Sequence, residues 1–252
     1  MSQLKQAKSS SFSRASDFEK CPLFFRYRHI EKIPDPRPVD TTLENPLDRG
    51  TRLHSLAENY VQNPKLKLAI ELEPFRERFD KLRKLYQMGI VTLEEPVAFD
   101  ITWNRVDYKD FDNAIYRMVA DVVIRPNNES IVVIDHKSGK KSGNEVKHHD
   151  QCMEYATSFA LIEPEVQEFT LQLWYLDQPQ EVGNPTIKVF TREQVLANFP
   201  KMKARHTKVI STTLFPAHPS QFACRFCPYK AGTVGSGKRA YPGTGHCRRN
   251  VI

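Results

Sequence analysis

The chain has 252 residues, of which 40% are hydrophobic and 10% aromatic, so it should fold around a packed core rather than stay disordered. Its 37 Lys and Arg outnumber 30 Asp and Glu, and the formal charge of +7 favours polyanionic partners such as nucleic acid. The N-terminal residues show no secretory signal, and no stretch approaches the roughly 20 apolar residues of a membrane span, so a cytoplasmic protein is expected.

The predicted elements begin with helices. The sequence SDFE from Ser16 resembles a capping box and predicts the start of a short helix, and Pro22 is typical of the first turn of a second one. The proline-rich segment 34–46 predicts a surface connection. Apolar residues at helical spacing then predict one helix over 49–61 and another over 75–88.

Strand character dominates the middle of the chain. β-branched and aromatic residues predict strands at 90–103, 116–124, 131–137, 168–176 and 186–190. A long helix is expected over 145–162, and the capping-box sequence TREQ at 191–194 predicts the start of the last long helix. This order indicates an α/β fold with a mixed central sheet flanked by helices, rather than a regular βαβ repeat.

Two carboxylates and an amine are expected to meet in one hairpin. A turn sequence, RPNNES, reverses the chain near Asn128 and places Asp121 opposite Asp135, while Lys137 projects from the same face. Opposed carboxylates about 5 Å apart repel each other unless a cation lies between them, and hard oxygen ligands favour Mg²⁺ or Mn²⁺. The simpler alternative is a charged strand end that only meets solvent.

Other polar residues lie on the flanking helices. His54 could complete the coordination of an ion held by the hairpin, although a lone helical histidine is more often structural. Gln151 and Tyr155 lie one turn apart, where an amide and a phenol could order the lysine or hold a DNA backbone. Spacing alone leaves a buried, purely structural tyrosine open.

The five cysteines, without a secretion signal, indicate metal binding or reduced thiols rather than a disulfide framework. Cys224 and Cys227 form a C-x₂-C pair, which is typical of a metal site because a tight turn presents both thiolates to one ion. The residues that could complete this site are Cys21, Cys247, His218 and His246. Free thiols are the alternative.

Together these motifs resemble the PD-(D/E)xK nuclease superfamily, above all its RecB-like branch, which includes the AddB nuclease domain and CRISPR-associated adaptation exonucleases with an iron–sulfur staple. The matching segments follow the family order over nearly the whole chain: SFSRASDFEKCPLFFRY, GTRLH, VADVVI, DHK, QCMEY and CRFCPY. Two features depart from the family pattern. The acid before x-Lys is Asp rather than the commoner Glu, and the gap before Cys247 is unusually long, as if a Gly-rich loop were inserted.

The resemblance implies a restriction-endonuclease-like core in a single nuclease domain over 13–252, after a flexible N-terminus at 1–12. Within that domain it implies a helical part at 13–90, a catalytic α/β core at 91–210 and a Cys-rich staple at 211–252 that joins the two terminal segments. The implied site residues are the Mg²⁺ or Mn²⁺ ligands His54, Asp121 and Asp135; the catalytic residues Asp121, Asp135 and Lys137; the DNA-binding or supporting residues Gln151 and Tyr155; and the 4Fe–4S or zinc ligands Cys21, Cys224, Cys227 and Cys247. Glu95 lies at a position where many members of this branch carry a further acid.

The function implied by the resemblance is that of a metal-dependent DNA exonuclease in recombination, repair or end processing, with a phage as one setting. The expected partner is DNA, single-stranded or with free ends, and no membrane; a recombination protein or a second copy of the chain are further candidates. The alternatives are a DNA endonuclease of the same fold and a non-cleaving DNA-binding module. The set of Asp121, Asp135 and Lys137 argues against the binding module, because binding alone does not need paired acids.

Overall fold

The computed structural model describes residues 6–37, 46–139, 141–178, 186–236 and 240–247. The chain forms two compact units, each assembled from segments that are distant in sequence. The described residues of the first unit fall within 6–37, 98–117 and 203–247, and those of the second within 46–97 and 118–202. In the described part of the chain, no helix is long and apolar enough to cross a membrane.

The first unit opens with helix α1 (Phe12–Lys20), which starts five residues earlier than the sequence predicts. Ser11 is its N-cap and accepts a hydrogen bond from the Arg14 N–H at 3.3 Å. Ser16, the predicted cap, instead lies inside the helix and donates to the Phe12 carbonyl at 2.9 Å. Either serine could begin a helix on local grounds, and the buried Phe12 and Ala15 extend the helical face back to Ser11.

Helix α2 (Pro22–Phe25) begins at the predicted proline and continues as a π-helical turn, η1 (Arg26–Ile30). The core of the first unit contains Ala7, Ala15, Phe18, Phe25, Val209 and Phe215. The segment before α1 is tied to this unit, because the Ser10 N–H donates to the Ile115 carbonyl at 2.6 Å.

A six-stranded sheet has the order β2-β1-β3-β4-β5-β6. Its strands are β1 (Val91–Phe99), β2 (Arg105–Val106), β3 (Tyr116–Asn127), β4 (Ser130–Lys137), β5 (Glu168–Tyr175) and β6 (Thr186–Thr191). Strands β4 and β5 are parallel, whereas β1–β2, β3–β4 and β5–β6 are antiparallel. The mixed sheet confirms the predicted fold class, and the short strand β2 is an element that the sequence did not indicate.

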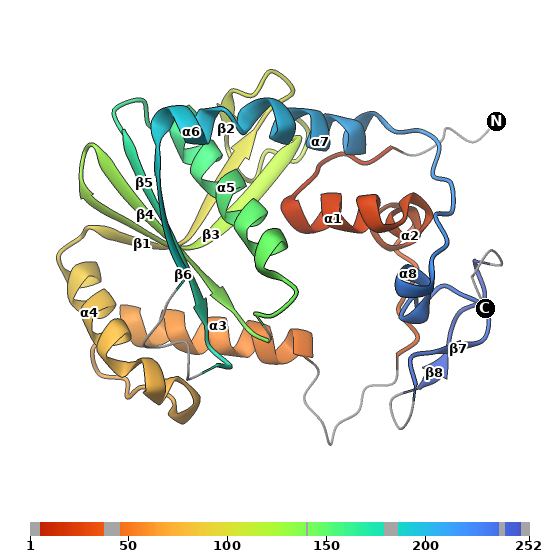
Figure 1. Ribbon diagram of the computed structural model, residues 1–252, viewed down its shortest axis with the longest axis horizontal. Coiled ribbons are helices and arrows are strands. Elements are labelled where there is room, and N and C mark those ends of the chain that lie inside the picture. The colour runs from red at the N-terminus through yellow and green to blue at the C-terminus, as the bar shows by residue number, and fades with distance from the viewer. Residues whose placement is uncertain (1–5, 38–45, 140, 179–185, 237–239, 248–252) are drawn as a thin grey trace. The chain divides into compact units, whose positions relative to one another are not determined.

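The second unit packs helices on both faces of the central strands (Figure 1). On one face lie α3 (Pro46–Gln62), the 3₁₀ helix η2 (Ile70–Phe75) and α4 (Arg76–Gln87). Their side chains share a core with the even-numbered residues Ile134 and Trp174 of β4 and β5. The opposite face packs against α5 (Glu145–Ile162), which matches its predicted bounds. Burial on both faces explains why β4 reads as a nearly continuous apolar run.

The predicted last long helix is two helices, α6 (Arg192–Leu196) and α7 (Phe199–Ser211). Thr191 and Gln194 form the predicted capping box, but it serves only the short α6. Pro200 stands in the first turn of α7, where its missing N–H costs nothing, whereas it would break a continuous helix.

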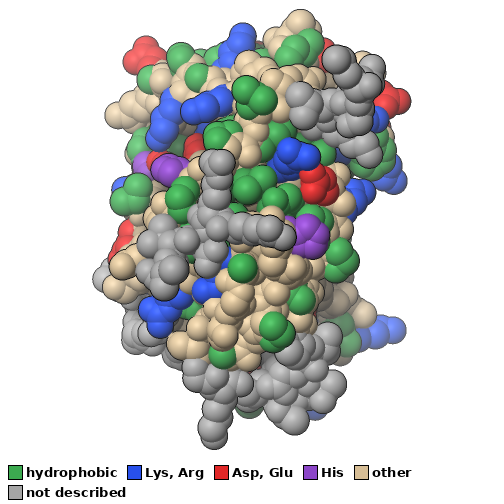
Figure 2. All heavy atoms as spheres, turned by 90° about the vertical axis from the view of Figure 1, so that its right-hand side faces the viewer, with side chains coloured by type: hydrophobic (Ala, Val, Ile, Leu, Met, Phe, Trp, Pro, Cys, Tyr) green, Lys and Arg blue, Asp and Glu red, His purple; other side chains and the backbone are tan. Residues whose placement is uncertain are grey.

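The C-terminal part of the first unit contains α8 (Gln221–Arg225) and a small hairpin of β7 (Thr233–Val234) and β8 (Tyr241–Pro242). Figure 2 views the side of Figure 1 on which these elements lie, and hydrophobic side chains there are interspersed with Lys and Arg. On this face, apolar and basic groups are mixed rather than separated.

Candidate active site

The β3–β4 hairpin has the predicted register. Val122 pairs with Ile134 and Val123 with Val133, so the same register continued by one residue would place Asp121 opposite Asp135. The register shifts only near the turn, between Ile124 and Asn127. The bulge lies on the turn side of both aspartates, and the pairs between it and Val122–Ile134 keep the register that the sequence predicts.

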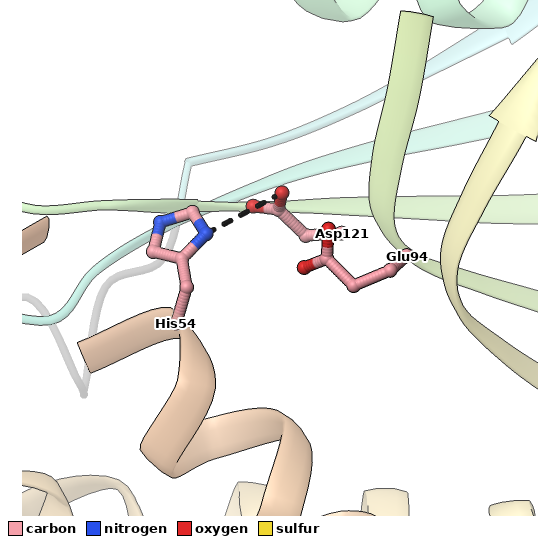
Figure 3. Close-up of side chains that lie close together, drawn as sticks. All are labelled: His54, Glu94 and Asp121. Atoms are coloured by element: carbon pink, nitrogen blue, oxygen red, sulfur yellow. Dashed lines mark ion pairs between the residues drawn. The ribbon is translucent and has the colours of Figure 1, made fainter. Parts of the chain in front are cut away.

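Three side chains from three elements converge beside this hairpin (Figure 3). His54 of α3, Glu94 of β1 and Asp121 of β3 offer ligand atoms that all lie within 4.8 Å of one another. The His54 Nδ1 lies 3.5 Å from Asp121 Oδ1, and the His136 N–H donates to Asp121 Oδ2 at 2.6 Å. One imidazole nitrogen and two carboxylates suit a divalent metal ion such as Mn²⁺ or Mg²⁺.

The group contains Glu94 rather than Glu95, the acid suggested by the resemblance. Glu95 instead forms a two-pronged pair with Arg125, with both N–O distances at 2.8 Å. Adjacent residues of a strand point to opposite faces, so only one of the two acids can reach Asp121. Glu94 also has a positive φ of 47°, which marks a local distortion of β1 at the site.

Asp135 and Lys137 form a second cluster on the same hairpin. The Lys137 Nζ lies 2.5 Å from Asp135 Oδ2 and donates to Gln151 Oε1 at 2.8 Å. The Gln151 amide in turn lies 2.6 Å from the Tyr155 hydroxyl. The structure thus brings four of the expected residues into one chain of contacts, while Asp135 remains outside the group of His54, Glu94 and Asp121.

Burial and neighbouring charges shift the pKa values of the acids and the lysine in the site. Burial, followed by the charges of Asp121 and Glu58, raises the pKa of Glu94 to about 7. Burial also raises the pKa of Asp135 to about 6, although Lys137 opposes this shift. Burial alone would lower the pKa of Lys137, but the pair with Asp135 outweighs it and raises that pKa. A divalent ion would relieve the repulsion between these acids.

The start of α3 is held close to the end of β4. A Cβ on Gly50 would lie only 2.7 Å from the Ser138 Oγ, so glycine permits the approach that brings His54 to the hairpin. Asp177 forms an ion pair with Arg49 and accepts the Gly139 N–H at 2.9 Å. A cleft of about 340 Å³ opens beside the site, and its lining includes Gly50, Thr51, His54, Ser55, Glu58 and Glu94.

The raised pKa of Glu94 predicts pH-dependent stability in the presence of EDTA. A carboxyl with a folded-state pKa of about 7 rather than 4.5 favours folding fully below the lower value and loses this contribution as the pH rises through about 7. The unfolding free energy of the wild type should therefore fall between about pH 5 and 8. We expect this fall to be about 1 kcal/mol smaller in Glu94→Gln, a value that allows for the partial exposure of Glu94. Urea unfolding at both pH values measures it.

The neighbouring Glu95→Gln variant is the matched control. It removes an ion pair with Arg125 and should lower stability by a similar amount at both pH values. The same two variants should differ in metal binding, with Mn²⁺ affinity falling only for Glu94→Gln. Equal pH dependence of the two variants would contradict the role of Glu94.

The four expected cysteines of the first unit line one cavity. Cys21 is the N-cap residue of α2, Cys224 lies in α8, and Cys227 and Cys247 complete the set. Burial, together with the charges of the other three thiols, raises the pKa of Cys227. His218 also lines this cavity, and its N–H donates to the Cys21 Sγ at 3.4 Å.

The long gap before Cys247 is closed by the β7–β8 hairpin. Cys247 forms a parallel bridge with Lys230 and donates its N–H to the Tyr229 carbonyl at 2.7 Å. Gly243 permits this return, because a Cβ there would lie 2.3 Å from the Lys230 carbonyl oxygen. The inserted segment therefore folds back and delivers its cysteine to the cavity.

The sequence of the chain matches the PD-(D/E)XK nuclease superfamily over residues 9–231. The mixed sheet, the flanking helices and the acid-rich hairpin agree with an α/β fold of the nuclease class. The chain belongs to the PD-(D/E)XK nuclease superfamily. The superfamily typically depends on divalent metal ions, and the group of His54, Glu94 and Asp121 could bind one.

Two solved structures are similar to this chain. The crystal structure of SSO0001 matches 90% of this chain and 86% of its own, at 14% identity and a TM-score of 0.37. The crystal structure of a "Putative exonuclease" from Eubacterium rectale matches 86% of each chain, at 14% identity and a TM-score of 0.48. The comparison with curated proteins finds no match.

Proposed function

We propose that the chain is a metal-dependent DNA exonuclease. The observation that supports this most is the convergence of His54, Glu94 and Asp121 next to the Asp135–Lys137 pair. Pure DNA binding has no use for three acids and a lysine in one partly buried site, because carboxylates repel the phosphate backbone. Membership of the nuclease superfamily agrees with hydrolysis of phosphodiester bonds.

His54, Glu94 and Asp121 would hold Mg²⁺ or Mn²⁺, and Asp135 is proposed as a further ligand. The metal would supply charge stabilisation at the scissile phosphate and activation of water. The His136 N–H orients the Asp121 carboxylate, which leaves the other oxygen toward His54. A hydrogen bond of this kind to a metal ligand holds that ligand in the orientation that metal binding needs.

Lys137 is proposed as the catalytic cation. Its raised pKa keeps it protonated at neutral pH, so it stabilises negative charge on the phosphate rather than removing a proton from water. Gln151 accepts from the Lys137 ammonium and Tyr155 contacts the Gln151 amide, so both act as positioning residues.

For the four cysteines we propose a 4Fe–4S cluster, with zinc as the alternative. Among the described residues, His54, Glu94 and Asp121 form the only trio of possible ligands within 4.8 Å of one another, so no three cysteine sulfurs are that close. Zinc–thiolate bonds of about 2.3 Å would bring the sulfurs to about 3.8 Å. A 4Fe–4S cluster would instead take one thiolate on each iron, and four cysteines around one cavity could supply them.

The proposed activity is tested by incubating the protein with linear duplex, circular duplex and single-stranded DNA, each with Mg²⁺ or Mn²⁺ and with EDTA. We expect cleavage of linear and single-stranded DNA that requires metal, and no cleavage of closed circles. Cleavage of circles would favour the endonuclease alternative, and metal-independent retention of DNA without cleavage would favour the binding module. We further propose a role in recombination, repair or end processing, for which the first result is a requirement.

A further inference from the structure

A second cavity lies in the second unit, on the α5 side of the sheet, and has a volume of about 100 Å³. Leu171, Leu173 and Cys152 form its apolar floor. In the antiparallel register Leu171 pairs with Lys188 and Leu173 with Thr186, so β6 supplies one wall. The cavity is separate from the cleft beside His54 and has no part in the metal site described above.

Basic groups surround the apolar floor. Lys141, His149 and Lys188 line the cavity, with Glu145 as the acid among them. Burial and the charge of Lys188 lower the pKa of His149. An apolar floor under a cationic rim suits a flat aromatic ring that carries an anionic group.

The cavity adjoins the proposed catalytic lysine. Tyr175 lines the cavity and is the β5 partner of Lys137 in the parallel register, and neighbouring strands lie about 4.8 Å apart. Cys152, in the floor, directly follows Gln151, which accepts a hydrogen bond from Lys137. A ligand in the cavity would therefore lie one strand away from the Asp135–Lys137 pair.

Helix α5 contributes side chains both to the contacts of Lys137 and to the lining of the cavity, from two neighbouring rows. Gln151 and Tyr155 lie one turn apart and order Lys137. His149 and Cys152, three residues apart, form the adjacent row and line the cavity. Movement of this helix would thus affect the lysine and the cavity together.

We propose that this cavity binds one nucleotide of the DNA strand being cleaved, with the base on Leu171 and Leu173 and the phosphate near Lys188. The inference deepens the proposed nuclease function and rests on it. A base enclosed by Leu171, Leu173 and Cys152 is neither stacked nor paired. The substrate is therefore single-stranded at this point, as in a free single strand or the frayed end of a duplex.

The test compares two charge reversals of exposed lysines in the second unit, Lys188→Glu in the cavity rim and Lys147→Glu on α5 outside it. Both change the net charge equally, so a general electrostatic effect would be the same for both. Fluorescence anisotropy with a labelled single-stranded oligonucleotide, in EDTA, measures affinity without cleavage. We expect Lys188→Glu to weaken binding about tenfold more than Lys147→Glu.

A competition experiment identifies the ligand. Free dAMP or dTMP should displace the oligonucleotide from the wild type and from Lys147→Glu, but not from Thr186→Trp, whose indole would fill the mouth of the cavity. Equal affinities of the two lysine variants, or equal competition in Thr186→Trp, would overturn the inference. Failure of the nuclease function would appear separately, as absence of metal-dependent cleavage by the wild type.

Discussion

Replacing Asp135 with Asn is expected to lower metal-dependent DNA cleavage by about 10³-fold or more, while DNA affinity in EDTA changes less than about threefold. Asp135 is 2% exposed and its carboxylate contacts the Lys137 ammonium. The amide keeps the shape of the side chain but loses the charge that holds the lysine and would attract the metal ion. The rate is measured on linear DNA at saturating Mg²⁺ or Mn²⁺.

The control for this variant is Asp150→Asn, which makes the same chemical change on α5. Asp150 is partly exposed and pairs loosely with Lys201 at 3.5 Å and with His149 at 3.9 Å. Its variant should cleave at the wild-type rate. Because a buried lysine without its partner also destabilises a fold, thermal unfolding of both variants is measured alongside. Full cleavage by a folded Asp135→Asn protein would remove the hairpin from the mechanism.

If the four cysteines hold the proposed cluster or zinc, replacing Cys21 with Ser is expected to release it and to lower the unfolding free energy of the first unit by about 3 kcal/mol or more. Cys21 stands at the junction of α1 and α2, whereas the other three cysteines of the cavity come from residues 224–247. A cluster bound by all four would join segments about two hundred residues apart, and loss of one ligand reopens that loop. Iron, sulfide and zinc per chain, with unfolding curves, measure the effect.

The control for the cysteine variant is Cys152→Ala, which removes the one cysteine that lies in the second unit. Its metal content should equal that of the wild type. A colourless wild-type protein with one zinc per chain would refute iron and keep the site. Unchanged metal content in Cys21→Ser would exclude Cys21 as a ligand and direct attention to His218, which lines the same cavity.

Local rules were enough to predict much of this protein from its sequence. The two-residue period of a strand and the turn near Asn128 predict Asp121, Asp135 and Lys137 on one face, and the observed register fits this prediction as far as the Val122–Ile134 pair. The bounds of α5 follow from its length and apolar content, and with them the one-turn spacing of Gln151 and Tyr155. These features depend only on neighbours in the chain.

Other features depended on contacts between distant segments, which local periodicity does not encode. Glu94 and Glu95 are equivalent as sequence, and only the packing of β1 beside Asp121 and Arg125 decides which acid joins the site. The return of Cys247 to the cysteine cavity needs the whole β7–β8 hairpin. The sequence by itself therefore determined the chemistry available, and the tertiary structure decided which groups meet, because burial and long-range pairing select among side chains that are locally alike.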